Sequence, residues 1–182
     1  MLLIEDIFLI GFAVLIIGAA IAIALKAPPF QIFFWGIVYI YIIIVLGVTL
    51  FPIPFQAVET MYPVPHNLIP FQSICSTLKM GMTYTSLVQI GGNIVISIPY
   101  GMLLYILGRK KGVQRFLLAL LFPLTIEFLQ MIIGHIIGLT YRSFDVDDLI
   151  LNTMGVYAGL ICGQILLRSH KEKIYKKVFP NR

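Results

Sequence analysis

Long apolar segments alternate with short polar connections along the chain. The apolar segments cover residues 7–25, 30–51, 87–107, 116–137 and 148–167. Each segment reaches about the 20 residues that a helix needs to cross the hydrocarbon layer of a bilayer. This pattern predicts an all-α fold, a polytopic helical membrane protein with five transmembrane helices.

The composition agrees with this fold class. Hydrophobic residues make up 59% of the 182 residues and only 12% are charged, whereas about a quarter of the residues in a soluble domain carry a charge. No connection between the apolar segments has room for a separate soluble domain of about 50 residues. We therefore expect a single membrane domain over residues 1–182.

The basic residues predict how the spans are oriented. Five spans place the chain ends on opposite sides, and eleven of the 13 Lys and Arg residues lie on the side of the C-terminus: Lys26, four between the third and fourth segments, and six after the fifth. Because cytoplasmic loops carry an excess of Lys and Arg, the N-terminus is predicted outside and the C-terminus in the cytoplasm. The net charge of +5 therefore does not point to nucleic acid. The tail "RSHKEKIYKK" is expected to be a solvated anchor that contacts anionic lipid headgroups.

Polar residues continue the packing face of the fifth segment. One helical face carries, at intervals of three or four residues, Asp145, Asp148, Asn152, Gly155, Gly159 and Gly163. Small residues at this spacing let another helix approach closely, so the carboxylates should point into protein. Capping by Asp145, with Asp148 as its third-position partner, is the alternative, but it does not explain Asn152. Asp147 falls off this face and is expected to cap the helix or face solvent.

Two further spans carry polar residues. In the third span, Asn93, Ser97 and Gly101 share a face. A hydrogen bond from Asn93 to another helix is the purely structural alternative there. Glu127 lies deep in the fourth span, with Gln130 one turn further outward. A carboxylate at such a depth usually faces the bundle interior, a cavity or a partner, although Glu127 could also be protonated or paired with Arg142.

The predicted directions of the three spans bring these residues to one side. The third and fifth spans run inward from the outside, while the fourth runs outward. The acids and amides of all three spans therefore fall in the outer half of the bilayer or at its outer surface, and we expect them to form one pocket: Asn93, Glu127, Gln130, Asp145, Asp148 and Asn152.

Four motifs occur in a recognisable order. They are "NLIPF" at residues 67–71, "GNIVISIPYG" at 92–101, "IEFLQ" at 126–130 and "RSFDVDDLILNTMGVYAGLICG" at 142–163. Together they resemble the VanZ-like family of bacterial membrane proteins. The resemblance implies a small multi-pass protein of the bacterial cytoplasmic membrane, associated in some members with resistance to the glycopeptide teicoplanin.

The polar residues at motif positions are Asn67, Asn93, Glu127, Gln130, Arg142, Asp145, Asp148 and Asn152. One position departs from the family pattern. The family usually has a bulky apolar residue, often Phe, where Ser97 stands. The serine would make this face of the third span more polar in this chain.

Binding is the first of three hypotheses. An outward-facing polar pocket could hold a membrane lipid, a lipid-linked cell-wall intermediate or an amphiphilic antibiotic whose acyl chain lies in the bilayer. Arg142 would bind a phosphate or carboxylate group, because a guanidinium group recognises anions in a bidentate manner. Neutral hydrogen bonds would come from the four amides of the motifs, Asn67, Asn93, Gln130 and Asn152.

Catalysis and transport are the other two hypotheses. In an enzyme acting on a lipid-linked substrate, Glu127 would be the general acid or base. Asp145 and Asp148 would orient a nucleophile or, with Asn152, hold Mg²⁺ or Ca²⁺. No nucleophile with a paired base is recognisable, so the sequence slightly favours binding. Transport is disfavoured because the polar groups lie on one side only.

Overall fold

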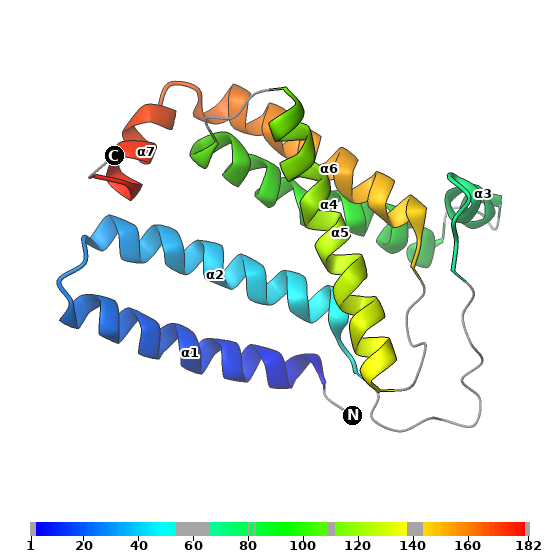
Figure 1. Ribbon diagram of the computed structural model, residues 1–182, viewed down its shortest axis with the longest axis horizontal. Coiled ribbons are helices and arrows are strands. Elements are labelled where there is room, and N and C mark those ends of the chain that lie inside the picture. Colours follow the sequence, from blue (N-terminus) through cyan, green and yellow to red (C-terminus); the bar gives the residue numbers. More distant parts are fainter. Residues whose placement is uncertain are drawn as a thin grey trace. The chain divides into compact units, whose positions relative to one another are not determined.

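The computed structural model describes residues 3–53, 66–79, 81, 83–108, 112–137 and 144–180. These residues form seven helices and no strand. In chain order the helices are α1 (Ile4–Ala24), α2 (Pro29–Leu50), α3 (Gln72–Lys79), α4 (Tyr84–Leu107), α5 (Val113–Ile136), α6 (Val146–Leu167) and α7 (Lys171–Val178), as Figure 1 shows.

Five of the helices, α1, α2, α4, α5 and α6, are long and apolar enough to cross a membrane. Their ends lie within three residues of the predicted ones. The all-α, multi-pass fold class is therefore confirmed, while the orientation in the membrane stays a prediction. The hydropathy pattern does not predict α3 and α7, which have eight residues each.

The chain divides into two compact units. One contains residues Met1–Ala57 and His170–Arg182, and the other contains Val58–Ser169. Helices α1, α2 and α7 belong to the first unit, and α3 to α6 belong to the second. All four sequence motifs therefore lie in the second unit.

In the first unit, α1 and α2 form a hairpin. Pro28 and Pro29 stand at the start of α2, where the missing N–H of proline costs no helical hydrogen bond. Along the hairpin, a Cβ atom on Gly47 would lie 3.1 Å from the ring of Phe8. The glycine thus makes room for an aromatic side chain of the neighbouring helix.

Helix α7 packs on the beginning of α2. Its side chains Tyr175 and Val178 are buried, and the side-chain amide of Gln31 donates a hydrogen bond of 3.1 Å to the carbonyl oxygen of Val178. The ring of Phe179 lies edge-on to that of Trp35, with centroids 6.3 Å apart. The tail is therefore an amphipathic helix with an apolar face held by the protein, not a fully solvated segment.

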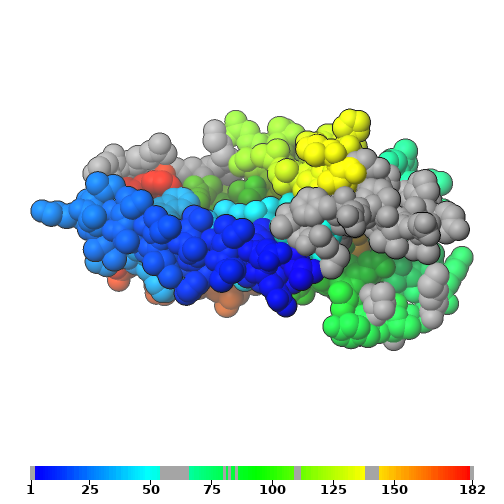
Figure 2. Space-filling model, turned by 90° about the horizontal axis from the view of Figure 1, so that it is seen from below, coloured from blue at the N-terminus to red at the C-terminus, as the bar shows by residue number. Residues whose placement is uncertain are grey.

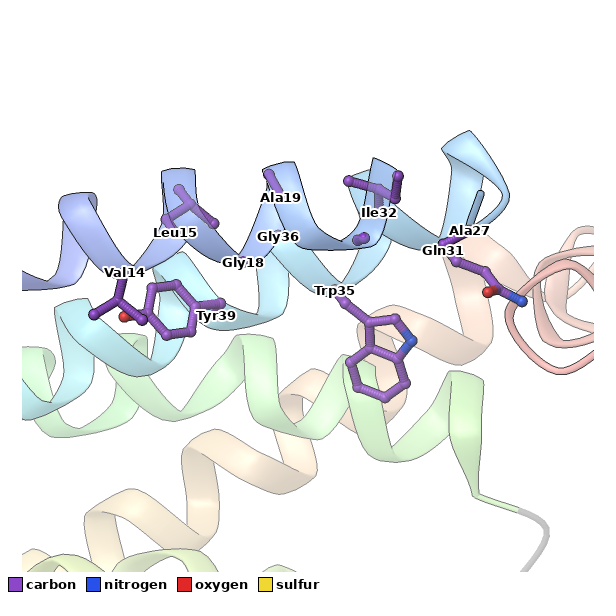
Figure 3. Close-up of a pocket in the computed structure, with 11 residues that line it drawn as sticks. Val14, Leu15, Gly18, Ala19, Ala27, Gln31, Ile32, Trp35, Gly36 and Tyr39 are labelled. Carbon is purple, nitrogen blue, oxygen red and sulfur yellow. The ribbon is translucent and has the colours of Figure 1, made fainter. Parts of the chain in front are cut away.

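A groove of about 310 Å³ follows the α1–α2 hairpin (Figure 3). Gly18 on α1 and Gly36 on α2 leave this space, and the rings of Trp35 and Tyr39 contribute to its lining. Helix α1, blue in Figure 2, lies at the surface and has many exposed large apolar side chains, with Leu9 73% exposed. Such a surface suits contact with acyl chains.

In the second unit, α4 and α6 run side by side in the same direction, with their backbones in contact (Figure 1). A Cβ atom on Gly155 would lie 2.2 Å from the carbonyl oxygen of Ile94, and one on Gly159 would lie 2.0 Å from that of Ile98. A Cβ atom on Gly101 would lie 2.0 Å from a carbonyl oxygen of α6. The predicted small-residue faces are thus the faces that meet.

Helix α5 runs in the opposite direction. The hydroxyl of Tyr100 on α4 donates a hydrogen bond of 3.0 Å to the carbonyl oxygen of Leu118, and the Tyr100 ring stacks on Phe122 with centroids 4.6 Å apart. Further along α5, Glu127 accepts a hydrogen bond from the backbone N–H of Asp145 at the start of α6. These contacts place the C-terminal half of α5 beside the beginning of α6.

We expect Gly159→Ala to destabilise the second unit by about 1–3 kcal/mol, because the added methyl group would overlap the Ile98 carbonyl and force the helices apart. Gly91→Ala on α4 is the matched control, since a Cβ atom there would meet nothing within 4 Å. That change should be neutral or stabilise the helix by up to about 1 kcal/mol. Thermal unfolding in detergent measures both variants, and equal effects would contradict the close packing of α4 on α6.

Candidate functional site

The beginning of α6 is joined to the motif segment at residues 66–79. Asp145 is the N-cap of α6, and its side chain accepts a hydrogen bond of 2.8 Å from the backbone N–H of Asp147. Asn67 pairs with Asp145 as a single parallel β-bridge. In the bridge, the Asn67 N–H donates to the Phe144 carbonyl at 2.9 Å, and the Val146 N–H donates to the Asn67 carbonyl at 3.0 Å. Asp145 thus has the N-cap role that the sequence offered as an alternative, and it also bonds to residues outside the helix.

Asn67 also uses its whole side chain in this contact. Its amide nitrogen donates to Oδ1 of Asp145 at 2.7 Å and to the hydroxyl of Ser73 at 2.9 Å. Its amide oxygen accepts the N–H of Ile69 at 3.1 Å. Ser73 in turn donates to Oδ2 of Asp145 at 2.6 Å. The two carboxylate oxygens of Asp145 thus accept three hydrogen bonds in all.

Asp147 has a different role from the one predicted. It was expected to cap α6 or face solvent, but it is 1% exposed and accepts hydrogen bonds from the N–H groups of Phe71 and Ile74. These N–H groups lie at the start of α3, where a carboxylate also complements the helix dipole. Phe71 has a φ of +66°, which is unusual for a residue with a side chain. The bond from its N–H to Asp147 offsets the cost of this conformation.

A second set of hydrogen bonds links α6 to α4. The side-chain amide of Asn93 donates to Oδ1 of Asp148 at 2.5 Å. One turn deeper, the hydroxyl of Ser97 lies 2.7 Å from Oδ1 of Asn152 and 3.0 Å from the carbonyl oxygen of Asn93. The amide nitrogen of Asn152 donates to the carbonyl of Asp148 at 2.8 Å. The polar residues at the N-terminal ends of the two small-residue faces therefore form hydrogen bonds directly with each other.

The packing of α4 on α6 gives a physical reason for the small residue at position 97. Ser97 is fully buried, and a Cβ atom on Gly155 would lie 2.8 Å from the Cβ atom of Ser97. A bulky side chain at this position would collide with α6 at the present helix separation. The serine therefore combines close approach of the helices with a hydrogen bond to Asn152.

Helix α5 contributes a buried acid and a buried amide. Glu127 is 2% exposed and Gln130 is 8% exposed, although both lie in a candidate membrane span. Oε2 of Glu127 is 3.3 Å from the N–H of Asp145. The prediction that these side chains face the protein interior is confirmed.

We call the joined set of side chains the acid–amide cluster. Hydrogen bonds connect six of the eight predicted site residues to this set, Gln130 is buried one turn from Glu127 on α5, and Arg142 lies outside the described residues. The cluster consists of Asn67, Ser73, Asn93, Ser97, Glu127, Gln130, Asp145, Asp147, Asp148 and Asn152. In the described part of the chain, no group of three or more His, Cys, Asp or Glu residues converges as a metal site would require.

Sequence reasoning missed Ser73 and Asp147 as members of the cluster. Ser73 follows the "NLIPF" motif by two residues, so its position in the chain was the available signal. Asp147 had none, because helical periodicity says nothing about a loop that crosses the end of the helix.

Comparison with known proteins gives one family. A family model described as VanZ/LLP1 matches residues 38–167, which is more than half of the chain. No curated protein and no solved structure matches the chain. The matched residues include all four motifs and every member of the acid–amide cluster.

We expect Asp147→Ala to release the segment at residues 66–79 without unfolding the bundle. Each hydrogen bond from an N–H group to a charged acceptor contributes about 1.5–3 kcal/mol, so exchange protection of the Phe71 and Ile74 amides should fall about tenfold or more. Hydrogen exchange of the peptide that covers this segment measures the effect.

Glu5→Ala is the control for that experiment, since it removes an exposed carboxylate from α1. It should leave the exchange of residues 66–79 unchanged. If Asp147→Ala exchanged at the wild-type rate, Asp147 would not be what holds α3.

Proposed function

Since the chain belongs to the VanZ-like family of membrane proteins, we propose that it acts in the bacterial cytoplasmic membrane and lowers susceptibility to a glycopeptide antibiotic of the teicoplanin type. It does so by binding an amphiphile at the acid–amide cluster. The amphiphile is a membrane lipid, a lipid-linked cell-wall intermediate or the antibiotic itself. These ligands share a polar or charged head and an acyl or isoprenoid chain.

The observation that carries this proposal is the arrangement of α5. Glu127 and Gln130 are buried on one side of the helix, while Phe128, Met131 and Ile132 are 44–50% exposed on the other sides. A buried ionisable residue in a span is costly and usually serves a function. An acyl chain would lie along the exposed apolar face of α5, and its head would reach around the helix toward the buried acid and amide.

Arg142 supplies the charge that such a head would need. The cluster contains four carboxylates, Glu127, Asp145, Asp147 and Asp148, which would repel an anionic head on their own. Arg142 precedes Asp145 by three residues. In the proposal its guanidinium group binds the phosphate or carboxylate of the ligand in a bidentate manner, and the acids hold the arginine in place.

The alternative is an enzyme that transfers or hydrolyses a group on a lipid-linked substrate, with Glu127, Asp145 and Asp148 as its catalytic acids. The hydrogen bonds of Asp145 count against it. Both oxygens of this carboxylate already accept bonds from Asn67, Ser73 and Asp147. Three of its about four acceptor sites are therefore occupied, which leaves little capacity to orient a nucleophile or to hold Mg²⁺ or Ca²⁺, so the geometry supports binding better than catalysis.

Antibiotic susceptibility in cells tests the proposal. Expression of the wild-type protein should raise the inhibitory concentration of teicoplanin severalfold over an empty vector. A glycopeptide without an acyl chain should be affected less. Gln130→Ala and Arg142→Ala should each remove most of the protection, because they take away a hydrogen bond and the anion-binding charge.

Two matched variants control for protein level and folding. Thr125→Ala changes an exposed position on α5, and Arg168→Ala changes an exposed arginine just after α6. Both should protect as well as the wild type, with protein levels checked by immunoblot. Full protection by Gln130→Ala and Arg142→Ala would contradict ligand binding at the cluster, and turnover of a cell-wall lipid by the purified protein would favour the enzyme.

A further inference from the structure

The segment after Asn67 presents apolar side chains on its outside. Leu68 is 67% exposed, Ile69 is 62% exposed and Phe71 is 57% exposed. Three large apolar residues within four positions would be costly in water. A loop on a water-facing surface normally shows the opposite arrangement, with polar side chains outward.

The polar atoms of the same segment point inward. The N–H groups of Phe71 and Ile74 bind Asp147, the N–H of Ile69 binds the side chain of Asn67, and Ser73 binds Asp145. Backbone polar groups that enter a bilayer must be satisfied by the protein, since no water is there to bind them. Three N–H groups of this segment meet that requirement, two of them through Asp147 of α6.

Helix α3 has two exposed stripes of different character. Cys75 and Leu78 are exposed on one side. The neighbouring stripe, at intervals of four and three residues, is polar and exposed, and consists of Gln72, Ser76 and Lys79. A short helix with an apolar stripe and a polar stripe, both uncovered, has the pattern of a helix lying in the membrane–water interface.

The apolar surface continues onto a spanning helix. Helix α3 contacts both α4 and α6 (Figure 1). The first turns of α4 carry the exposed side chains Tyr84, Leu87 and Val88, which are 84%, 54% and 52% exposed. Since α4 is a candidate membrane span, its exposed apolar face would contact lipid, and α3, which packs on α4, would add the patch at residues 68–78 to this surface.

We propose that residues 68–79 form an interfacial element that enters the leaflet in which α6 begins. Leu68, Ile69, Phe71 and Leu78 contact acyl chains, while Gln72, Ser76 and Lys79 lie among the headgroups. The bilayer is the partner of this surface. The buried acids of α6 hold the element in place, and this assignment does not depend on any ligand of the acid–amide cluster.

Tryptophan fluorescence in vesicles tests the proposal. Trp35 is the only tryptophan, so Trp35→Phe provides a dark background in which Leu68→Trp, Leu78→Trp and Ser76→Trp are made one at a time. In one experiment the vesicles contain phosphatidylcholine with brominated acyl chains, which quench from inside the bilayer. In the other, iodide is added to the buffer and quenches from the water. Val95→Trp, at a 65% exposed position within α4, is the reference for a residue in contact with acyl chains.

Brominated lipid should quench Leu68→Trp and Leu78→Trp severalfold more than Ser76→Trp, with emission shifted to the blue, and iodide should show the opposite order. Ser76→Trp is the matched control because it lies on the same helix as Leu78 and is also exposed. Equal iodide quenching at all three positions, with none by brominated lipid, would place the element in water and overturn the proposal. Emission that changes only with protein density in the membrane would also overturn it, because a second copy of the chain would then cover the patch.

Discussion

Two carboxylates at the beginning of α6 determine how the motif-bearing unit is organised. A buried carboxylate is very costly unless hydrogen bonds satisfy its oxygens. Asp145 and Asp147 are 8% and 1% exposed. Asp147 accepts hydrogen bonds from two N–H groups of the segment at residues 66–79, and Asp145 accepts two of its three hydrogen bonds from the same segment. That segment cannot move away from α6 without leaving charge unsatisfied. The acids therefore fix a loop, a short helix and the end of a span in one arrangement.

Close packing of α4 on α6 supplies the second constraint. Because Gly155 and Gly159 let the helix backbones touch, the polar residues above them meet at hydrogen-bond distance. Asn93 reaches Asp148, and Ser97 reaches Asn152. An amide that bonds an acid across a glycine-lined contact fixes the register of the two helices as well as their separation. The cluster thus depends on close backbone approach as well as on hydrogen bonds to the acids.

Hydropathy and spacing predicted five spans to within three residues, because a bilayer imposes the length and polarity of a spanning helix. Spacing also predicted which faces of α4 and α6 meet, because small residues at intervals of about four let another helix approach closely. Helix α3 and the role of Asp147 could not be predicted. Their positions depend on hydrogen bonds between residues more than 70 positions apart, and no local period records such a contact.

The most direct measurement of the central claim is a double-mutant cycle between Asn67 and Asp145, whose side chains are bonded at 2.7 Å. Asn67→Ala, Asp145→Ala and the double variant would be unfolded by denaturing detergent, and their free energies of unfolding compared. A coupling energy of about 1–3 kcal/mol is expected for a hydrogen bond to a buried carboxylate. Additive effects, within about 0.5 kcal/mol, would contradict the claim that the acids of α6 hold the motif segment in place.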